Sequence, residues 1–186
     1  MAGLVTQIKT WIQENRDISR FLFWLVGLLA AFYLFEWVID QFPRFYYYDL
    51  LKYKVIYNGV DVAEWLLHLT GFETLAFEQQ NYFQVQGGGI LKVGIPCSAF
   101  DLFVFYAIMI VAYPGSLKYK LIFIPAGILA IHGLNIARFY ALAMSDLYSR
   151  EYFELHHHFI FKAVVYAFIF LIWMWFVRLS TPKKAK

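Results

Sequence analysis

The sequence predicts an all-α protein that forms a polytopic helix bundle in a membrane, with about four transmembrane helices. Of its 186 residues, 61% are hydrophobic and 22% are aromatic, whereas only 16% are charged. A water-soluble domain would have too little polar surface to cover such a core. Four apolar stretches approach the roughly 20 residues that cross a bilayer, and they lie at 21–39, 98–115, 121–143 and 158–177.

The segment 40–96, between the first and second predicted spans, carries too many charges to cross the membrane as a whole. Its tyrosine-rich part, 42–57, is typical of a segment at the depth of the lipid headgroups. Residues 60–72 predict a short interfacial or re-entrant helix that ends at Gly71. The sequence leaves open whether this part enters the bilayer. Residues 81–95 alternate partially around three glycines, which predicts a short outer hairpin.

The chain is expected to form one membrane-embedded domain over 21–178, between an amphipathic cytoplasmic segment at 1–20 and a basic cytoplasmic tail at 179–186. Short basic flanks stay in the cytoplasm, which places both termini on that side. Nucleic-acid binding is not expected, because these flanks and the tail account for the net charge of +3. The basic residues of these flanks are Lys9, Arg16, Arg20, Lys118, Lys120, Arg178, Lys183, Lys184 and Lys186.

The only cysteine, Cys97, follows Pro96 and opens the second predicted helix at its outer end. Proline is common at the start of a helix, and the unpaired N–H groups of a first turn favour a thiolate over a thiol. The alternative is a cysteine that packs as a small hydrophobic residue. Asp101 lies four residues further, on the same predicted helix face. It could orient a histidine, pair with Arg138 or Lys162, or act as a buried structural ion partner.

Arg138 lies among apolar residues near the outer end of the third predicted helix, on the same side of the membrane as Cys97. His132 and Asn135 precede it at steps of three residues, so the three side chains occupy neighbouring faces of one helix. A charged residue with polar neighbours inside a bundle indicates a functional site. The alternative is an arginine that extends toward the headgroups.

Three histidines at 156–158 open the fourth predicted helix, again on the outer side. Adjacent helical residues point about 100 degrees apart, so the three cannot all face one site. One histidine suffices as a proton donor. The apolar positions 161, 164 and 168 continue a stripe that begins at His157, which favours His157 over His158. Metal binding with His132 is an alternative, but the usual i, i+4 pair is missing, and no metal is expected.

The order of these residues resembles the exosortase and archaeosortase family, and especially the short exosortases of the Bacteroidetes type. The resemblance rests on PCSAF at 96–100, LNIARFYAL at 134–142 and HHHFIFKAVVYAFIFLIW at 156–173. It implies that Cys97, Arg138 and His157 form the catalytic triad, with His158 as the second candidate for the histidine. Members of the family often have glycine where this chain has Ala99.

The resemblance implies a cysteine protease or transpeptidase, without a cofactor, in the bacterial inner membrane. Its substrates would be exported proteins that end in a short motif, a transmembrane helix and a basic tail. Cleavage on the outer side would form a thioester, which an amine acceptor or water then resolves. Two other functions stay open: a metal or proton transporter that uses His132, 156–158 and Asp101, and a non-catalytic membrane scaffold.

Overall fold

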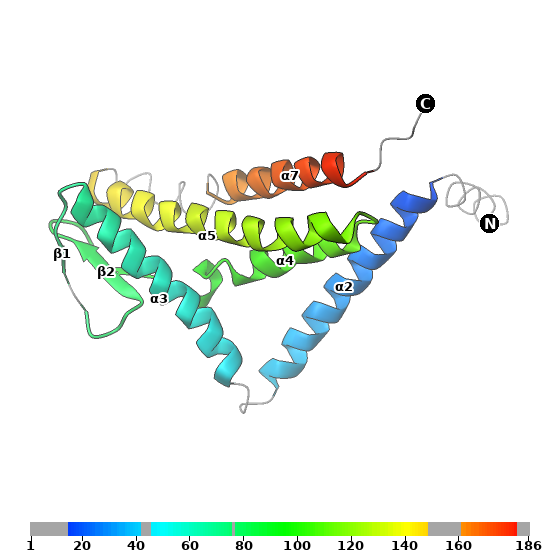
Figure 1. The fold of residues 1–186 in the computed structure, drawn as a ribbon. Helices are drawn as coiled ribbons and strands as arrows, with labels where there is room; N and C mark the ends of the chain where they lie inside the picture. The colour runs from blue at the N-terminus through cyan, green and yellow to red at the C-terminus, as the bar shows by residue number, and fades with distance from the viewer. Residues whose placement is uncertain (1–14, 42–45, 76, 149–160, 182–186) are drawn as a thin grey trace, which may run out of the picture.

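The computed structural model describes residues 15–41, 46–75, 77–148 and 161–181, and most of them are helical (Figure 1). The prediction of an all-α membrane bundle is confirmed. A small three-stranded sheet and one turn of 3₁₀-helix, η2, complete the fold. The elements are α2 (Arg16–Asp40), α3 (Tyr46–Leu69), β1 (Thr74–Leu75), β2 (Tyr82–Val85), β3 (Leu91–Lys92), η2 (Ile95–Cys97), α4 (Phe100–Ala112), α5 (Leu117–Tyr148) and α7 (Phe161–Ser180).

Helix α5 is the central helix of the fold and packs against α3, α4 and α7 (Figure 1). Its 32 residues give it a length of about 48 Å, at a rise of about 1.5 Å per residue. A hydrocarbon core is only about 30 Å thick. Helix α5 is therefore longer than a crossing of the bilayer requires, and α3 and the sheet pack against one of its ends (Figure 1).

Three of the described helices, α2, α5 and α7, are long and apolar enough to cross a membrane. The prediction of a full span at 98–115 is wrong, because α4 has only 13 residues. Ala99 has a left-handed backbone, which delays the start of the helix. At the other end Tyr113 is extended, as expected for a residue before proline, and Pro114 follows. Helix α4 is thus a short apolar helix packed against α2, α5 and α7.

The prediction of a separate short helix at 60–72 is also wrong, because α3 is continuous from Tyr46 to Leu69. Gly59 does not interrupt it. A methyl group at this glycine would lie 2.8 Å from the ring of Phe139, so the glycine lets α3 approach α5 closely. The predicted end at Gly71 is confirmed. Gly71 has a φ of +88°, and its N–H and that of Phe72 bond the last carbonyls of the helix.

The predicted hairpin around the three glycines is confirmed. Strands β2 and β3 are antiparallel, with Tyr82 opposite Lys92, and β1 pairs with the other edge of β2. The carboxylate of Asp146, near the end of α5, accepts a hydrogen bond from the N–H of Gly89 in the turn. This bond ties the hairpin to α5.

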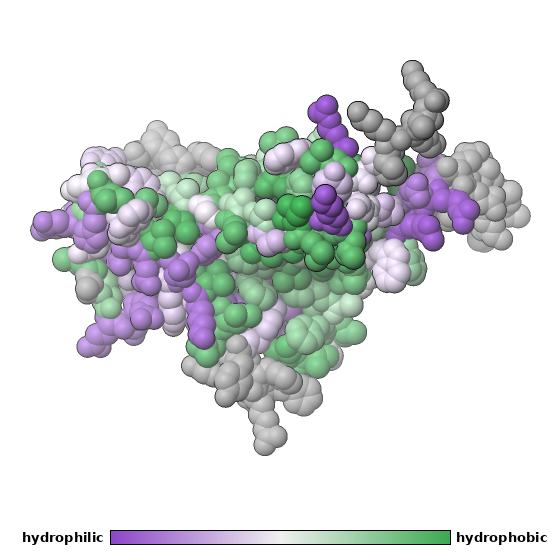
Figure 2. All heavy atoms as spheres, in the orientation of Figure 1, coloured by the Kyte–Doolittle hydropathy of each residue, from purple (hydrophilic) through white to green (hydrophobic). Residues whose placement is uncertain are grey.

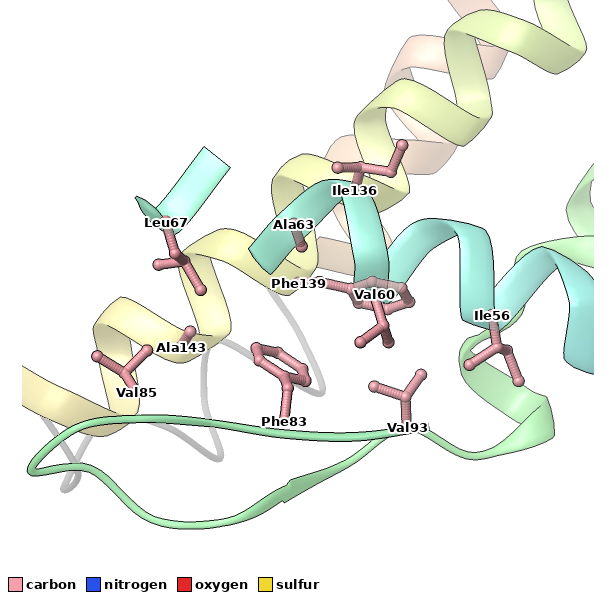
Figure 3. Packing of buried hydrophobic residues seen from close by; sticks show 10 residues of the cluster. All are labelled: Ile56, Val60, Ala63, Leu67, Phe83, Val85, Val93, Ile136, Phe139 and Ala143. Carbon is pink, nitrogen blue, oxygen red and sulfur yellow. The ribbon is translucent and has the colours of Figure 1, made fainter. Parts of the chain in front are cut away.

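A hydrophobic core joins α3, the sheet region and the end of α5. Figure 3 shows side chains from these three parts pointing toward one another. The stripe on α3 follows the i, i+4, i+7, i+11 pattern of one helix face, which explains why α3 stays helical past Gly59. The core consists of Ile56, Val60, Ala63, Leu67, Phe83, Val85, Val93, Ile136, Phe139 and Ala143.

A second core lies between α4, α5 and α7 and includes Tyr106, Ile131 and Ile169. Tyr106 is fully buried, and its hydroxyl donates to the carbonyl of Phe123 at 2.7 Å. Outside this core, α2 carries many large apolar side chains on its surface. Figure 2 shows hydrophobic residues over the half of the molecule that holds α2 and α4, with hydrophilic residues more frequent around α3 and the sheet. The first half is suited to lipid contact.

Candidate active site

Cys97 lies in the turn between β3 and α4. It is the last residue of η2, and its N–H donates to the carbonyl of Gly94 at 2.9 Å. Helix α4 begins only at Phe100. The prediction that Cys97 occupies the first turn of this helix is therefore wrong, because Cys97 belongs to the preceding 3₁₀ turn and two further residues separate it from the helix start.

Ala99 is the only described non-glycine residue with a positive φ, at 59°. This left-handed conformation is costly for a residue with a Cβ atom. It turns the chain from η2 into α4, and the carbonyl of Ala99 then accepts a helical bond from Phe103 at 3.0 Å. Ser98 is buried and its Oγ accepts the N–H of Phe100 at 3.2 Å. These two hydrogen bonds thus fix the turn that carries the thiol to the start of α4.

Two side chains from α5 reach Cys97. The Nη2 atom of Arg138 lies 3.7 Å from the sulfur, and the Nδ2 atom of Asn135 donates to the carbonyl of Cys97 at 3.0 Å. Asn135 is only 4% exposed. Because the two residues are three apart on α5, one helix face supplies both contacts. Asn135 holds the backbone of the cysteine while Arg138 places a positive charge beside its sulfur.

Arg138 also lines a cleft of about 170 Å³ between the start of α4 and the start of α7. Lys162 and Asp101 contribute charge to this cleft, and Phe161 and Val165 contribute apolar walls. The Nε atom of Arg138 is buried and has no hydrogen-bond partner among the described residues. The cleft therefore contains a partly buried guanidinium whose Nε atom could bind a further polar group.

Cys97 itself lines a second, smaller cavity of about 50 Å³. Its other walls come from the sheet region and α5 and include Leu91, Lys92, Val93 and Phe139. Pro96 and Ser98, the neighbours of the cysteine, line the larger cleft. The turn that carries the thiol therefore separates the two cavities.

Asp101 pairs with neither Arg138 nor Lys162 among the described contacts. Its carboxylate lies 3.8 Å from the Nζ atom of Lys52, and the side chain is 60% exposed. It also does not share a helix face with Cys97, which precedes α4. Lys52 is the partner that sequence reasoning missed, since nothing in the sequence of the tyrosine-rich segment indicates a buried lysine.

Lys52 is the centre of a polar cluster between α2, α3 and α4. Its Nζ atom lies 2.8 Å from a carboxylate oxygen of Glu36 and 4.6 Å from the ring centre of Tyr48. The hydroxyl of Tyr48 donates to the same oxygen at 2.9 Å. Burial raises the pKa of the Tyr48 phenol well above its usual range, and the hydrogen bond to Glu36 adds to this effect. The cluster joins the end of α2 to the start of α4.

A model of the transmembrane exosortase family matches residues 22–175, which is most of the chain. The chain belongs to the transmembrane exosortase family. No curated protein and no solved structure matches it. The matched range of this exosortase includes Cys97, Arg138 and the histidines at 156–158. Family membership and the three apolar helices make it a multi-pass membrane protein, and the family acts on proteins with sorting signals.

The other predicted site residues of the exosortase lie apart from Cys97 or outside the described residues. His132 faces α3, where its Nε2 atom lies 2.8 Å from the Oδ1 atom of Asn58. His157 and His158 fall in 149–160, which the structure does not describe. Within the described residues, no group of three His, Cys, Asp or Glu side chains could hold a metal ion.

The face of α7 that packs against the other helices of the exosortase differs from the apolar stripe predicted from the sequence. Val165 and Ile169 are buried, whereas Val164 is 47% exposed. The stripe through 157, 161, 164 and 168 is therefore not the buried face. The choice of His157 stays a prediction, but the buried face of α7 is one residue away from the apolar stripe on which that choice was based.

Proposed function

We propose that this exosortase is a cysteine peptidase or transpeptidase that cleaves the C-terminal sorting signals of exported proteins. The observation that carries the proposal is the distance of 3.7 Å between the guanidinium of Arg138 and the sulfur of Cys97. A neighbouring cation favours the thiolate, which is the nucleophilic form of cysteine. The hydrogen bond from Asn135 to the carbonyl of Cys97 supports it, because it fixes the nucleophile relative to α5.

The proposed reaction begins when the thiolate of Cys97 attacks the carbonyl carbon of the scissile peptide bond. Arg138 first stabilises the thiolate and then the oxyanion that forms on the carbonyl oxygen. When the C–N bond breaks, a histidine of 156–158 donates a proton to the departing amine. The acyl group stays on the sulfur as a thioester. Water or an amine acceptor then attacks the thioester and restores the thiol.

We place the exosortase in the bacterial inner membrane with both termini in the cytoplasm and Cys97 on the outer side. The start of α2 and the end of α7 stand at the same end of the bundle as the turn between α4 and α5 (Figure 1). The N–H of Ser116 in this turn donates to the Oγ atom of Ser180 at 2.9 Å. Cys97 lies at the other end of α4, so this orientation requires α4 and the residues that flank it to carry the chain across the membrane together. Short basic flanks lie at the end of the bundle that holds the α4–α5 turn, and they support a cytoplasmic location for that end.

Labelling of introduced cysteines tests this orientation. In a Cys97→Ala background, a membrane-impermeant maleimide applied to spheroplasts should label Gly88→Cys, which lies in the hairpin turn, and spare Ser116→Cys. Both positions should react after the membrane is permeabilised. Labelling of Ser116→Cys alone in intact spheroplasts would reverse the proposed orientation.

The activity is tested with a secreted reporter that ends in the motif, transmembrane helix and basic tail of an exported protein from the source bacterium. Cells with the wild-type exosortase should release a shortened reporter, and cells with Cys97→Ala or Arg138→Gln should retain the precursor. Equal amounts of exosortase in the membrane are the control. A transporter or a scaffold would process nothing, and Cys97→Ala would leave its function unchanged. Processing that survives Cys97→Ala would refute the proposal.

A further inference from the structure

The outer edge of β3 lies beside Cys97. The strand order in the sheet is β1-β2-β3, so β3 is an edge strand, and no described strand pairs with its outer side. Leu91 and Lys92, which form β3, line the smaller cavity together with Cys97. The chain then continues from β3 through Gly94 into the turn that carries the thiol. A peptide on this edge would lie next to the nucleophile.

The hydrogen bonds of the hairpin determine where the backbone of β3 points. The N–H of Val93 donates to the carbonyl of Asn81 at 2.8 Å, and Lys92 lies opposite Tyr82. Residues of an antiparallel strand alternately bond their partner strand and point away from it. The N–H and C=O of Lys92 therefore point away from β2. Tyr82 agrees with this register, because its N–H donates to Gln79 on the side away from β3.

The sheet also has one face packed and one face open. Phe83, Val85 and Val93 are buried against α3 and α5 (Figure 3). The side chains of Lys92 and Ile90 are exposed. The packed face and the hydrogen bond from the N–H of Gly89 to the carboxylate of Asp146 hold the hairpin in place. An added strand would thus pair with an edge that is already fixed.

We propose that the sorting motif of the substrate binds as an extended strand on the outer edge of β3. The N–H and C=O of Lys92 would pair with its main chain and guide the scissile carbonyl to Cys97. This inference rests on the proposed function. An extended substrate segment is the occupant favoured here, because the edge leads directly into the turn of the nucleophile and shares a cavity with it. Main-chain pairing gives affinity that is largely independent of side chains.

A proline at position 92 tests the pairing without breaking the sheet. Proline removes one N–H, and the N–H of Lys92 takes no part in the pairing of β2 with β3. Edge strands tolerate proline at such positions. Lys92→Pro should lower the rate of reporter processing at least tenfold, whereas Thr74→Pro, at the equivalent outward-pointing position of the opposite edge strand β1, should stay within twofold of wild type. Alkylation of Cys97 by iodoacetamide should be unchanged in both variants, which shows that the site is intact.

Cross-linking locates the substrate directly. A photo-reactive amino acid is introduced at Ile90, which precedes β3, or at Leu75 on the opposite edge strand β1; these positions are 59% and 47% exposed. In a Cys97→Ala background, which retains the uncleaved reporter, position 90 should cross-link to the reporter and position 75 should not.

Normal processing by Lys92→Pro would overturn the inference. It would also be overturned if position 90 cross-linked only to a second copy of the exosortase, or only to another part of its own chain. Processing in Cys97→Ala cells would instead refute the proposed function, so the two failures are distinguishable.

Discussion

Arg138 lies 3.7 Å from the sulfur of Cys97, although 41 residues separate them in the sequence. The contact joins the turn before α4 to the middle of α5, and Asn135 adds a second bond from the same helix face. In the proposed mechanism this guanidinium acts on the sulfur of Cys97 and then on the oxyanion. The reactivity of Cys97 should therefore depend on Arg138.

We expect Arg138→Gln to slow the alkylation of Cys97 by iodoacetamide at neutral pH about tenfold, which corresponds to about 1.4 kcal/mol in the activation free energy. Arg138→Lys keeps a charge but loses the planar donor group and should give an intermediate rate. The measurement is mass spectrometry of the alkylated protein in membranes. Arg178→Gln is the matched control. Arg178 lies in the last turn of α7, and the variant should react as wild type does. Equal rates in all variants would mean that Arg138 does not act on the sulfur.

Asn135→Ala removes the bond to the carbonyl of Cys97 and should lower reporter processing about tenfold, since a lost hydrogen bond to a buried group costs about 1–2 kcal/mol. Asn135→Asp should be at least as harmful, because a carboxylate would repel the carbonyl. Asn58→Ala is the control, since Asn58 bonds His132 and not the turn of the nucleophile. A loss of processing in Asn58→Ala as large as in Asn135→Ala would assign Asn135 a general packing role.

Ala99→Gly should stabilise the exosortase. Ala99 has a φ of 59°, a conformation that costs a residue with a Cβ atom about 1–2 kcal/mol and glycine almost nothing. The greater freedom of glycine in the unfolded chain offsets part of this gain, which leaves about 0.5–1 kcal/mol. Intrinsic tryptophan fluorescence during heating in detergent measures the change. Ala107→Gly, inside α4, should lower the melting temperature, and a lower value for Ala99→Gly as well would contradict the expected strain.

The cluster around Lys52 predicts a non-additive effect on stability. Glu36→Gln leaves a cation whose side chain is only 11% exposed without its closest anion. We expect a loss of about 3 kcal/mol in the free energy of unfolding, because removing one partner of a buried ion pair leaves the other charge uncompensated. The double variant Glu36→Gln with Lys52→Met should recover most of this loss. Additive losses would show that the pair contributes little as a unit.

Sequence patterns predicted the membrane bundle, the hairpin and the end of α3, because apolar runs and glycine-rich turns are local signals. They did not predict the length of α4. Its start depends on the left-handed backbone of Ala99, and an alanine gives no sign of such a conformation. Lys52 was missed for a similar reason, since its burial depends on contacts with Glu36 and Asp101, which are distant in sequence. The polar residues His132, Asn135 and Arg138 were recognised together, but only the tertiary contacts show that His132 faces Asn58.

The packing of α7 gives the sharpest prediction for the histidine. Val165 is buried and lines the cleft together with Arg138, and Ile169 is buried one turn later. We predict that the helical repeat of α7 continues to residues before Phe161, in which case position 158, seven residues before Val165, would lie in line with this face. The same repeat leads to position 157 from Val164, which is 47% exposed. On this premise we predict that His158 is the proton donor, whereas the apolar stripe in the sequence favoured His157.

Each histidine is replaced by alanine separately, and reporter processing is followed at equal levels of membrane protein. We expect His158→Ala to lower processing at least a hundredfold, in the range of a lost general acid, and His156→Ala and His157→Ala to keep most of it. Alkylation of Cys97 is measured in the same membranes to show that the nucleophile is still in place. Loss of processing in His157→Ala alone would return the role to His157 and mean that the repeat of α7 does not continue to position 158. Processing in all three single variants would remove these histidines from the proposed mechanism and leave Arg138 and Cys97 without a proton donor.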